Sequence, residues 1–311
     1  MPHDFHPDAL RASLAAWKAG QPLPRQAQAY QRFYGLDLPH GGVAFDGGLG
    51  VFQAAGFDVV AQYWLPARPR ATLFVLHGFY DHMGLYRHVI EWALGQGMAV
   101  LSCDLPGHGL SSGARASISD FGHYQATLHG LFDHAAYLGL PRPWHLLGQS
   151  TGAAIAIDHL LYLPASPIDG ETVLLAPLVR PRAWGWSQVS YHALRPFVKG
   201  IARRFSENSN DPTFLPFLQA DPLQPLHLPT AWVGALVKWV RHIEAAPRSA
   251  RSPLIVQGEQ DMTVDWRHNL KVLDAKFAAP RVLRLPQARH HLANELPALR
   301  GEYFSFLEGY F

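Results

Sequence analysis

The sequence predicts an α/β protein with a mostly parallel central sheet, helices on both faces of that sheet, and a helical cap insertion. From about residue 51 onward, short apolar runs alternate with segments of helical spacing, as in strands joined by crossover helices. Between Pro177 and about Ala246 this alternation stops and only helical spacing remains. We therefore expect a core formed by residues 51–177 and 247–311, with a helical cap (lid) at residues 178–246.

Seven short apolar runs are predicted to be the strands of the sheet. In chain order they are residues 58–64, 72–76, 99–103, 144–147, 172–175, 254–257 and 282–285. Helical spacing predicts helices at residues 85–94, 124–137, 152–161 and 266–276. Residues 1–50 precede the alternation and predict an N-terminal helical extension, with one helix through Leu10, Leu14 and Trp17 and a second around Tyr30 and Phe33.

The predicted cap is rich in tryptophan and shows no clear strand. Open α/β sheets bind ligands at the carboxyl ends of their strands, so we expect the cap to cover that edge. Its indole rings could line an acyl channel or touch a lipid surface, but we expect most of them to pack the cap against the core. The four residues are Trp184, Trp186, Trp232 and Trp239.

The composition is that of a compact globular protein. Of the 311 residues, 48% are hydrophobic and 16% charged, which excludes a disordered or coiled-coil chain. The net charge of +2 is too small to predict nucleic-acid binding. Cys103 is the single cysteine, so no intramolecular disulfide can form. Because the chain shows neither a signal-peptide pattern nor a long uncharged apolar run, we expect a cytoplasmic protein with at most peripheral membrane contact.

The segment Gly-Gln-Ser-Thr-Gly at residues 148–152 has the spacing of a nucleophile elbow, in which a serine stands on a sharp turn between a strand and a helix. A predicted strand precedes Ser150 and a predicted helix follows it, as this motif requires. Gly148 and Gly152 leave room for the backbone to close around the turn. We therefore expect Ser150 to be a nucleophile rather than a simple helix cap.

A serine hydroxyl is a weak nucleophile at neutral pH and needs a base, together with an acid that orients the base. With this motif the three groups follow one another in the order serine, acid, histidine. Asp261 and His290 each follow a predicted strand by a short loop, so we expect Asp261 to be the acid and His290 the base. Asp265, four residues further along, is a rival for the acid.

The oxyanion that forms during acyl transfer needs preorganised N–H donors. We expect these to be the backbone N–H of Thr151, which follows the nucleophile, and that of Phe79, in the loop after the strand at 72–76. We expect no metal and no other cofactor, because no histidine pair has metal-ligand spacing and the serine chemistry needs none. His82 and His108 are expected to order loops through hydrogen bonds.

Three further segments resemble the monoglyceride lipase and lysophospholipase branch of the α/β-hydrolases. The branch carries the motifs H-G-x-G-E-H-x-x-R-Y, D-x-x-G-H-G-x-S and A-R-H-E-x-x-N-E, which this sequence resembles at residues 77–86, 104–111 and 288–295. The third match selects His290 over His291. The resemblance runs from about residue 57 to 310. It implies an α/β-hydrolase fold and a serine esterase acting on a small single-chain acyl ester, such as a monoacylglycerol or a lysophospholipid.

Five residues in the first of these segments and around the elbow differ from the pattern of the branch. Tyr80, Asp81 and Leu85 replace the second glycine, the glutamate and the arginine of the first motif. Gln149 stands where many relatives have histidine, and Ala153 where many have a further glycine. None of these changes removes a catalytic group. They are expected to alter the mouth of the substrate pocket.

Two other functions stay open at this point. A serine aminopeptidase would share the scaffold and would need cap carboxylates to hold the substrate ammonium, for which Glu207, Asp211 and Asp221 are available. A non-catalytic ligand-binding relative would keep the fold without the chemistry, because a fold alone does not establish function.

Overall fold

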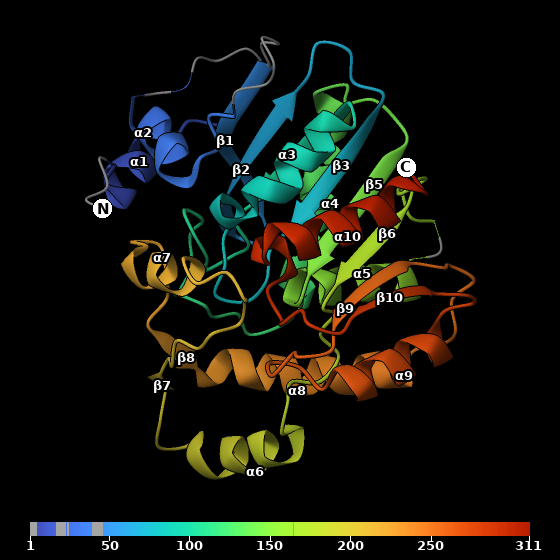
Figure 1. Ribbon diagram of the computed structural model, residues 1–311. Coiled ribbons are helices and arrows are strands. Elements are labelled where there is room, and N and C mark those ends of the chain that lie inside the picture. The colour runs from blue at the N-terminus through green and yellow to red at the C-terminus, as the bar shows by residue number, and fades with distance from the viewer. Residues whose placement is uncertain (1–4, 17–22, 24, 39–45, 164) are drawn as a thin grey trace.

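The computed structural model describes residues 5–16, 23, 25–38, 46–163 and 165–311. Eight strands within these residues form the central sheet (Figure 1). They are β1 (Asp46–Ala54), β2 (Phe57–Leu65), β3 (Ala71–Leu76), β4 (Met98–Cys103), β5 (Trp144–Gln149), β6 (Thr172–Leu175), β9 (Leu254–Gly258) and β10 (Arg281–Leu285). Their order across the sheet is β1-β2-β4-β3-β5-β6-β9-β10.

The prediction of a mostly parallel sheet is confirmed. β4, β3, β5, β6, β9 and β10 pair in parallel, and β2 joins β4 antiparallel. All seven predicted strands are present, each within two residues of its expected bounds. β1 was not predicted, because its three glycines weaken the strand pattern. It pairs with β2 through a two-residue turn at Ala55 and Gly56, both with positive φ, as tight hairpins require.

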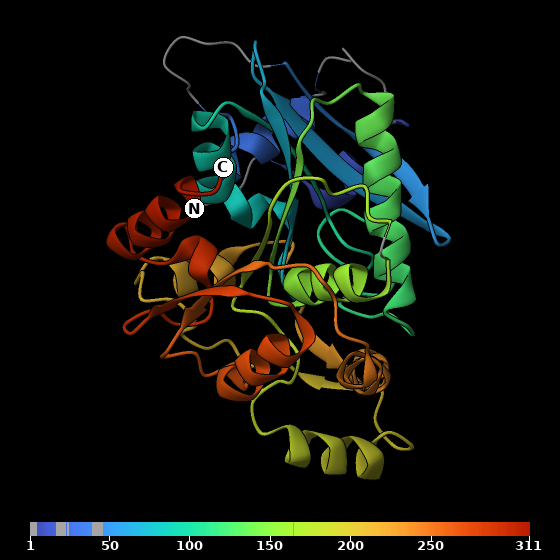
Figure 2. The same cartoon turned by 90° about the vertical axis from the view of Figure 1, so that its right-hand side faces the viewer.

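Helices cover both faces of the sheet (Figure 2). On one face lie α3 (Arg87–Gly95), which follows the 3-10 turn η1 (Met83–Tyr86), and α10 (Pro297–Glu308), which follows the turn η2 (Leu292–Asn294). On the other face lie α4 (Gly122–Tyr137) and α5 (Thr151–Tyr162), with α9 (Trp266–Lys276) beyond them. Each face of the sheet has its own hydrophobic core. β3, β5 and β9, which lead to the predicted site, are buried throughout, whereas the edge strand β10 is mostly exposed.

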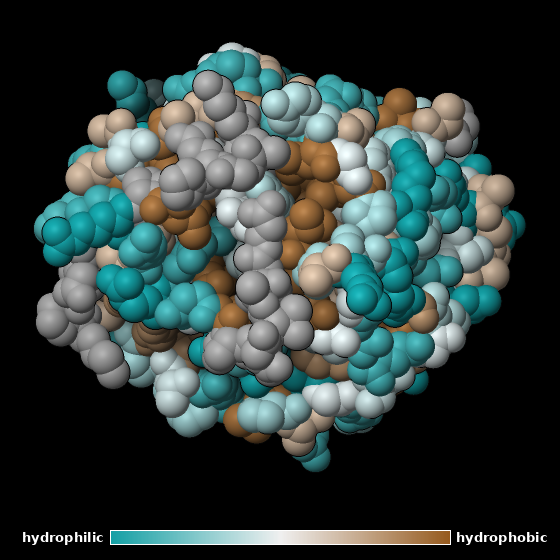
Figure 3. Space-filling view, turned by 90° about the horizontal axis from the view of Figure 1, so that it is seen from above, coloured by the Kyte–Doolittle hydropathy of each residue, from teal (hydrophilic) through white to brown (hydrophobic). Residues whose placement is uncertain are grey.

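The N-terminal extension contains α1 (Pro7–Ser13) and α2 (Arg25–Tyr34). Leu10 and Tyr30 are fully buried and belong to the same core as α3 and α10. Trp17, predicted to share the face of Leu10, lies outside the described residues. The end of the molecule opposite the cap, seen in Figure 3, shows hydrophilic and hydrophobic side chains interspersed.

The insertion at 178–246 contains α6 (Trp184–Leu194), β7 (Gly200–Ala202), α7 (Phe214–Ala220), β8 (His227–Pro229) and α8 (Thr230–Ala245). The prediction that it holds no strand is wrong, since β7 and β8 pair antiparallel. At three residues each, they are too short to show an alternating pattern. Figures 1 and 2 place α6 outermost, away from the sheet. Three of the four cap tryptophans are buried and pack inward, whereas Trp186 is 76% exposed.

Candidate active site

Ser150 stands on a strained turn between β5 and α5. Its backbone has φ 52° and ψ −108°, in the region that residues with side chains rarely occupy. The turn closes because two glycines lack side chains. A Cβ on Gly148 would lie 2.3 Å from the Gly152 carbonyl group, and a Cβ on Gly152 would lie 2.2 Å from the Leu76 carbonyl oxygen. The serine is thereby held at the carboxyl end of β5, next to the end of β3.

The first turn of α5 begins directly after the serine. The Ser150 carbonyl oxygen accepts the first helical hydrogen bond, from the Ala154 N–H at 2.9 Å. The N–H groups ahead of Ala154 have no partner within the helix, and the helix dipole makes this end positive. The Thr151 N–H, one of the two predicted oxyanion donors, belongs to this turn.

Asp261 and His290 meet at the carboxyl ends of β9 and β10. The Nδ1 atom of His290 lies 2.7 Å from Oδ2 of Asp261, and both side chains are almost completely buried. The other carboxylate oxygen accepts the backbone N–H groups of Thr263 (2.8 Å) and Val264 (3.1 Å). Asp265 does not contact His290: it is the N-cap of α9, where its Oδ1 accepts the backbone N–H of the third residue of that helix.

The charged forms of Asp261 and His290 stabilise each other. Burial alone would lower the pKa of His290, but the attraction of Asp261 and the hydrogen bond between them outweigh it, so the pKa is raised. Burial alone would raise the pKa of Asp261, but His290 and the two backbone N–H groups hold it below its usual range. Asp261 thus stays ionised, fixes the proton on Nδ1 and leaves Nε2 of the neutral ring as an acceptor.

The loop after β3 carries the second predicted oxyanion donor, and His77 fixes its orientation. The Leu105 N–H donates to Nε2 of His77 at 2.8 Å, so the ring proton sits on Nδ1 and is donated to the Gly78 carbonyl oxygen at 2.7 Å. Burial, with a contribution from His108, lowers the pKa of His77 to about 3, so this tautomer persists near neutral pH. Because the peptide bond is planar and trans, holding the Gly78 oxygen also sets the direction of the Phe79 N–H.

A second buried network, which sequence reasoning missed, joins this loop to the loop of His290. The Asp81 carboxylate accepts hydrogen bonds from Tyr86 (3.0 Å) and from Nε2 of His291 (3.1 Å). The Tyr86 hydroxyl in turn accepts the Gly78 N–H at 2.9 Å. Burial alone would raise the pKa of Asp81, but His291 overcomes this effect and lowers it. Asp81 stands at the glutamate position of the first motif, which was the one signal available for this network.

The two histidines expected to order loops do so. His108 donates from Nδ1 to the Pro106 carbonyl oxygen at 3.0 Å, within its own loop. His82 contacts the Gly84 N–H through Nδ1 (3.2 Å) and Asp221 of the cap through Nε2 (2.8 Å). Within the part of the chain that the structure describes, no group of three His, Cys, Asp or Glu side chains is arranged to hold a metal.

The predicted residues come together around one cavity of about 380 Å³ between the core and the cap. Phe79, Ser150, Thr151 and His290 all line it. Asp261 lies behind the His290 ring and is not among the lining residues. The structure therefore brings the predicted nucleophile, base and oxyanion donors to one cavity, with the acid buried against the base.

A second, mostly apolar cavity of about 360 Å³ adjoins the first inside the cap, between α6 and α8. The two cavities share Pro181, Leu228 and Trp232 as lining residues. The Trp232 ring stacks on the Phe79 ring, with centroids 3.7 Å apart. The wall between the cavities is thus in direct contact with the oxyanion loop.

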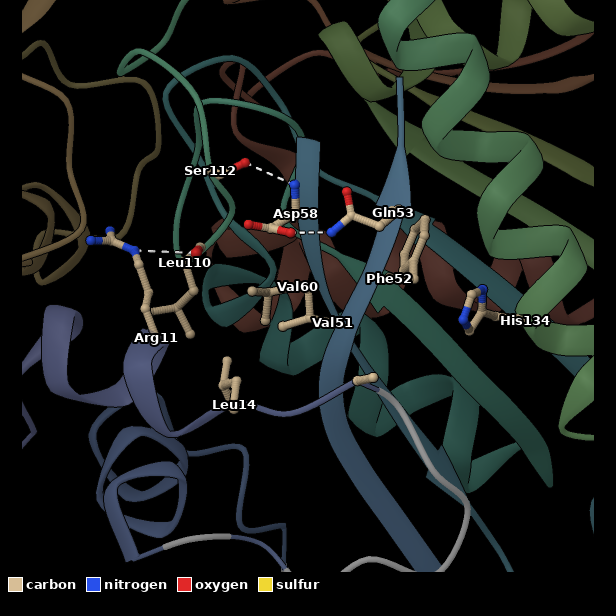
Figure 4. Close-up of a pocket in the computed structure, with 11 residues that line it drawn as sticks. Arg11, Leu14, Val51, Phe52, Gln53, Asp58, Val60, Leu110, Ser112 and His134 are labelled. Atoms are coloured by element: carbon tan, nitrogen blue, oxygen red, sulfur yellow. Dashed lines mark hydrogen bonds between the residues drawn. The ribbon is translucent and has the colours of Figure 1, made fainter. Parts of the chain in front are cut away.

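A further cavity of about 570 Å³ lies away from this site, beside β1, β2 and the end of α1 (Figure 4). Arg11 at its edge donates to the Leu110 carbonyl oxygen at 3.2 Å, and the Gln53 side chain donates to Asp58. Ser112 and His134 both line it, but each is bonded elsewhere: Ser112 Oγ accepts the Asp58 N–H at 2.8 Å, and Nδ1 of His134 lies 2.9 Å from the Gly130 carbonyl oxygen. The contact of Arg11 ties the N-terminal extension to the core.

The sequence and the fold of this chain are similar to those of known hydrolases. The sequence profile of the family described as serine aminopeptidase, S33 (Hydrolase_4) matches residues 67–297. Monoglyceride lipase of Mus musculus is 28% identical over 274 residues, covering 84% of this chain and 86% of its own length. Monoacylglycerol lipase of Mycolicibacterium smegmatis is 25% identical, covering 77% of this chain and 88% of its own.

Solved structures extend the likeness to the fold. A soluble variant of monoglyceride lipase from Saccharomyces cerevisiae superposes with a TM-score of 0.72 at 17% identity, covering 88% of this chain and 98% of its own. At that identity the superposition shows the fold, whereas the profile match over most of the chain shows the family. The resemblance inferred from the motifs is confirmed. The chain belongs to the serine aminopeptidase S33 family, has the α/β-hydrolase fold, and is a carboxylic ester hydrolase related to the monoglyceride lipases.

Proposed function

We propose that this protein hydrolyses the ester bond of a single-chain acyl lipid, a monoacylglycerol or a lysophospholipid, through an acyl-enzyme on Ser150. One observation carries the proposal. The serine on the strained elbow shares its cavity with His290, whose Nδ1 is bonded to Asp261, and an apolar cavity adjoins this site. The lipid relatives support the substrate class.

The chemistry follows from the placement of the groups. Nε2 of His290 takes the hydroxyl proton as Oγ of Ser150 attacks the ester carbonyl carbon, and Asp261 stabilises the resulting imidazolium. The negative charge that develops on the carbonyl oxygen is accepted by the N–H groups of Phe79 and Thr151. Collapse of the tetrahedral species breaks the ester C–O bond, and the imidazolium protonates the departing alcohol. Water, deprotonated by the same ring, then releases the fatty acid and restores the serine.

The apolar cavity under α6 is the proposed site of the acyl chain. Its lining is dominated by hydrocarbon and aromatic side chains, including Trp184, Leu194 and Leu236. Burying a methylene group in such surroundings contributes about 0.8 kcal/mol, so an eight-carbon chain gains far more here than a glycerol head group would. The head group is left in the more polar catalytic cavity, near Arg203 and Arg204.

Exposed apolar side chains of the cap support contact with a lipid surface. Trp186 is 76% exposed and Phe197 86% exposed, and Val189, Ile201 and Leu226 are exposed beside them in the chain or the paired strands. A cluster of this kind marks a surface that binds an apolar partner. We place it against the lipid that supplies the substrate, as a peripheral contact.

The structure disfavours aminopeptidase activity. The three cap carboxylates that could have held a substrate ammonium are engaged elsewhere: Glu207 pairs with an arginine, Asp211 bonds to the turn before α7, and Asp221 is buried against a histidine. The cavity instead presents Arg203 and Arg204, whose charge repels an ammonium group.

Two further facts bear on location. No helix among the described residues has the length and apolar character needed to cross a bilayer. Cys103 is buried in β4, so folding requires no disulfide chemistry. We propose a cytoplasmic location on these grounds.

The test compares wild type with Ser150→Ala, and with Ser305→Ala as a control at an exposed serine of α10. Each protein is assayed on monoacylglycerols of graded chain length, lysophospholipids and aminoacyl amides, and treated with a fluorophosphonate probe. We expect ester turnover and probe labelling in wild type and Ser305→Ala, and neither in Ser150→Ala. Turnover that survives in Ser150→Ala would remove the nucleophile assignment, and turnover of amides alone would favour the aminopeptidase. A wild type that neither turns over nor labels would favour a non-catalytic protein.

A further inference from the structure

The N-terminal helix α2 contacts the cap through a buried carboxylate and through aromatic rings. The Tyr34 hydroxyl, at the last residue of α2, donates to Oδ1 of Asp221 at 2.6 Å. Asp221 follows α7 directly, and α2 contacts α7 through the stacked rings of Phe33 and Phe217, whose centroids are 5.5 Å apart. Tyr34 lies outside residues 67–297, the part of the chain that the family profile matches.

The Asp221 carboxylate is the centre of a complete hydrogen-bond network. Oδ1 accepts from Tyr34 and from the Leu223 N–H (2.9 Å), while Oδ2 accepts from Nε2 of His82 (2.8 Å) and from the Gln224 amide (2.9 Å). The side chains of Asp221 and His82 are both fully buried. A buried carboxylate is costly unless each of its oxygens is paired, so loss of the tyrosine hydroxyl would leave Oδ1 with one donor.

His82 connects this carboxylate to the oxyanion loop. The Gly84 N–H donates to its Nδ1, so the ring proton must sit on Nε2, where it faces Asp221. His82 closes the loop that begins at His77, and Tyr80, with φ 71°, makes the bend between them. One end of the loop is thus held by His77 and the other by the pair of His82 and Asp221.

Tyr34 also touches the loop directly. Its ring stands edge-on to the His82 ring, with centroids 4.8 Å apart. A Cβ on Gly84 would lie 2.9 Å from Cγ of Tyr34, so the loop makes room for this ring through a glycine. The hydroxyl and the ring of Tyr34 therefore act on the same three-residue segment, 82–84.

We propose that Tyr34 is a positioning residue for catalysis: through Asp221 and His82 it holds the far end of the oxyanion loop, and with it the Phe79 N–H. The inference rests on the proposed function of that loop. It assigns the N-terminal extension to the catalytic apparatus, because α2 supplies a hydrogen bond that neither the core nor the cap replaces.

The chain offers a matched control on the same helix. Tyr30 is one turn before Tyr34 and is fully buried, yet its hydroxyl makes no hydrogen bond within the described residues. Tyr34→Phe and Tyr30→Phe thus delete the same atom from neighbouring buried rings. We expect Tyr34→Phe to lower kcat by about 10-fold with KM nearly unchanged, less than the 10²- to 10³-fold loss on deleting an oxyanion donor. Tyr30→Phe should stay within twofold of wild type in both constants.

The pairing is tested with Asp221→Asn and the double variant Tyr34→Phe/Asp221→Asn, each checked by thermal melting so that only folded protein is compared. If Tyr34 acts through the carboxylate, Tyr34→Phe costs much less in the Asp221→Asn background than in wild type. Equal losses in the two backgrounds, equal losses in Tyr34→Phe and Tyr30→Phe, or wild-type kcat in Tyr34→Phe would each overturn the inference. An active wild type with inactive Ser150→Ala keeps the proposed function intact in all of those cases.

Discussion

Gly152 offers a direct test of the geometry around the nucleophile, through the variant Gly152→Ala. The new Cβ would lie 2.2 Å from the Leu76 carbonyl oxygen and 2.8 Å from the His77 carbonyl oxygen. Real Cβ atoms do not approach other atoms closer than 3.0 Å, so α5 and the end of β3 must move apart by at least about 0.8 Å. Both contacts are with backbone, which cannot rotate away as a side chain would.

That movement separates the two proposed oxyanion donors, since Thr151 begins α5 and Phe79 follows β3. Misplacing one donor by about 1 Å costs on the order of 10²-fold in rate, so we expect kcat to fall by about 10²-fold. Overpacking of this kind also destabilises the fold by about 1–3 kcal/mol, which lowers the melting temperature without unfolding the protein at 25 °C.

The assay measures kcat and KM on a monoacylglycerol, the rate of fluorophosphonate labelling, and thermal melting by circular dichroism. Gly301→Ala is the control, because Gly301 lies inside α10 and a Cβ there meets no atom within 4 Å. It should match wild type in rate and melt at the same temperature or slightly higher. A folded Gly152→Ala enzyme with kcat within threefold of wild type would refute the reasoning, since the two donors would then tolerate the separation.

Three further predictions concern the acid, the base and the cavity wall. Asp261→Asn should lower kcat by about 10⁴-fold because the imidazole loses its orienting partner. Asp265→Asn should leave kcat near that of wild type and change the stability by less than about 1 kcal/mol, because asparagine caps a helix about as well as aspartate. A large loss of kcat in Asp265→Asn alone would exchange the roles of the two residues. For wild type, kcat/KM should fall as the pH drops through the raised pKa of His290, above 6.5, because a protonated ring cannot accept the serine proton. In Asp261→Asn the attraction that raises this pKa is lost, so the acidic limb of any residual activity should move to lower pH. Trp232→Ala should open the catalytic cavity to the apolar one. Because each buried methylene contributes about 0.8 kcal/mol, the ratio of long-chain to short-chain kcat/KM should rise by up to about fourfold per added methylene. An unchanged chain-length profile across graded monoacylglycerols would show that the Trp232 ring does not separate the two cavities along the path of the acyl chain.

Local sequence patterns were sufficient to predict seven strands of the sheet and the strand, turn and helix around Ser150. Most of the seven predicted strands are buried on both faces, which requires a continuous apolar run that can be recognised in the sequence. The exception is the edge strand β10, which is mostly exposed and was recognised from alternating apolar residues. The elbow is equally local, because strand, two glycines, serine and helix lie within a few residues. β1 was not predicted, because its glycines have little preference for strands. It forms a strand because it pairs with β2 along its whole length.

What the sequence by itself determined was the α/β architecture, the candidate nucleophile and the strand ends at which an acid and a base would follow. Only the tertiary structure decided which aspartate meets His290, because Asp261 and Asp265 are four residues apart and differ in whether the carboxylate faces the ring or caps α9. The structure alone also revealed the contacts of Asp81 with His291, 210 residues away, and of Tyr34 with Asp221, 187 residues away. Hydrogen bonds across such separations depend on how the N-terminal helix, the cap and the core pack together, and no local periodicity records that packing.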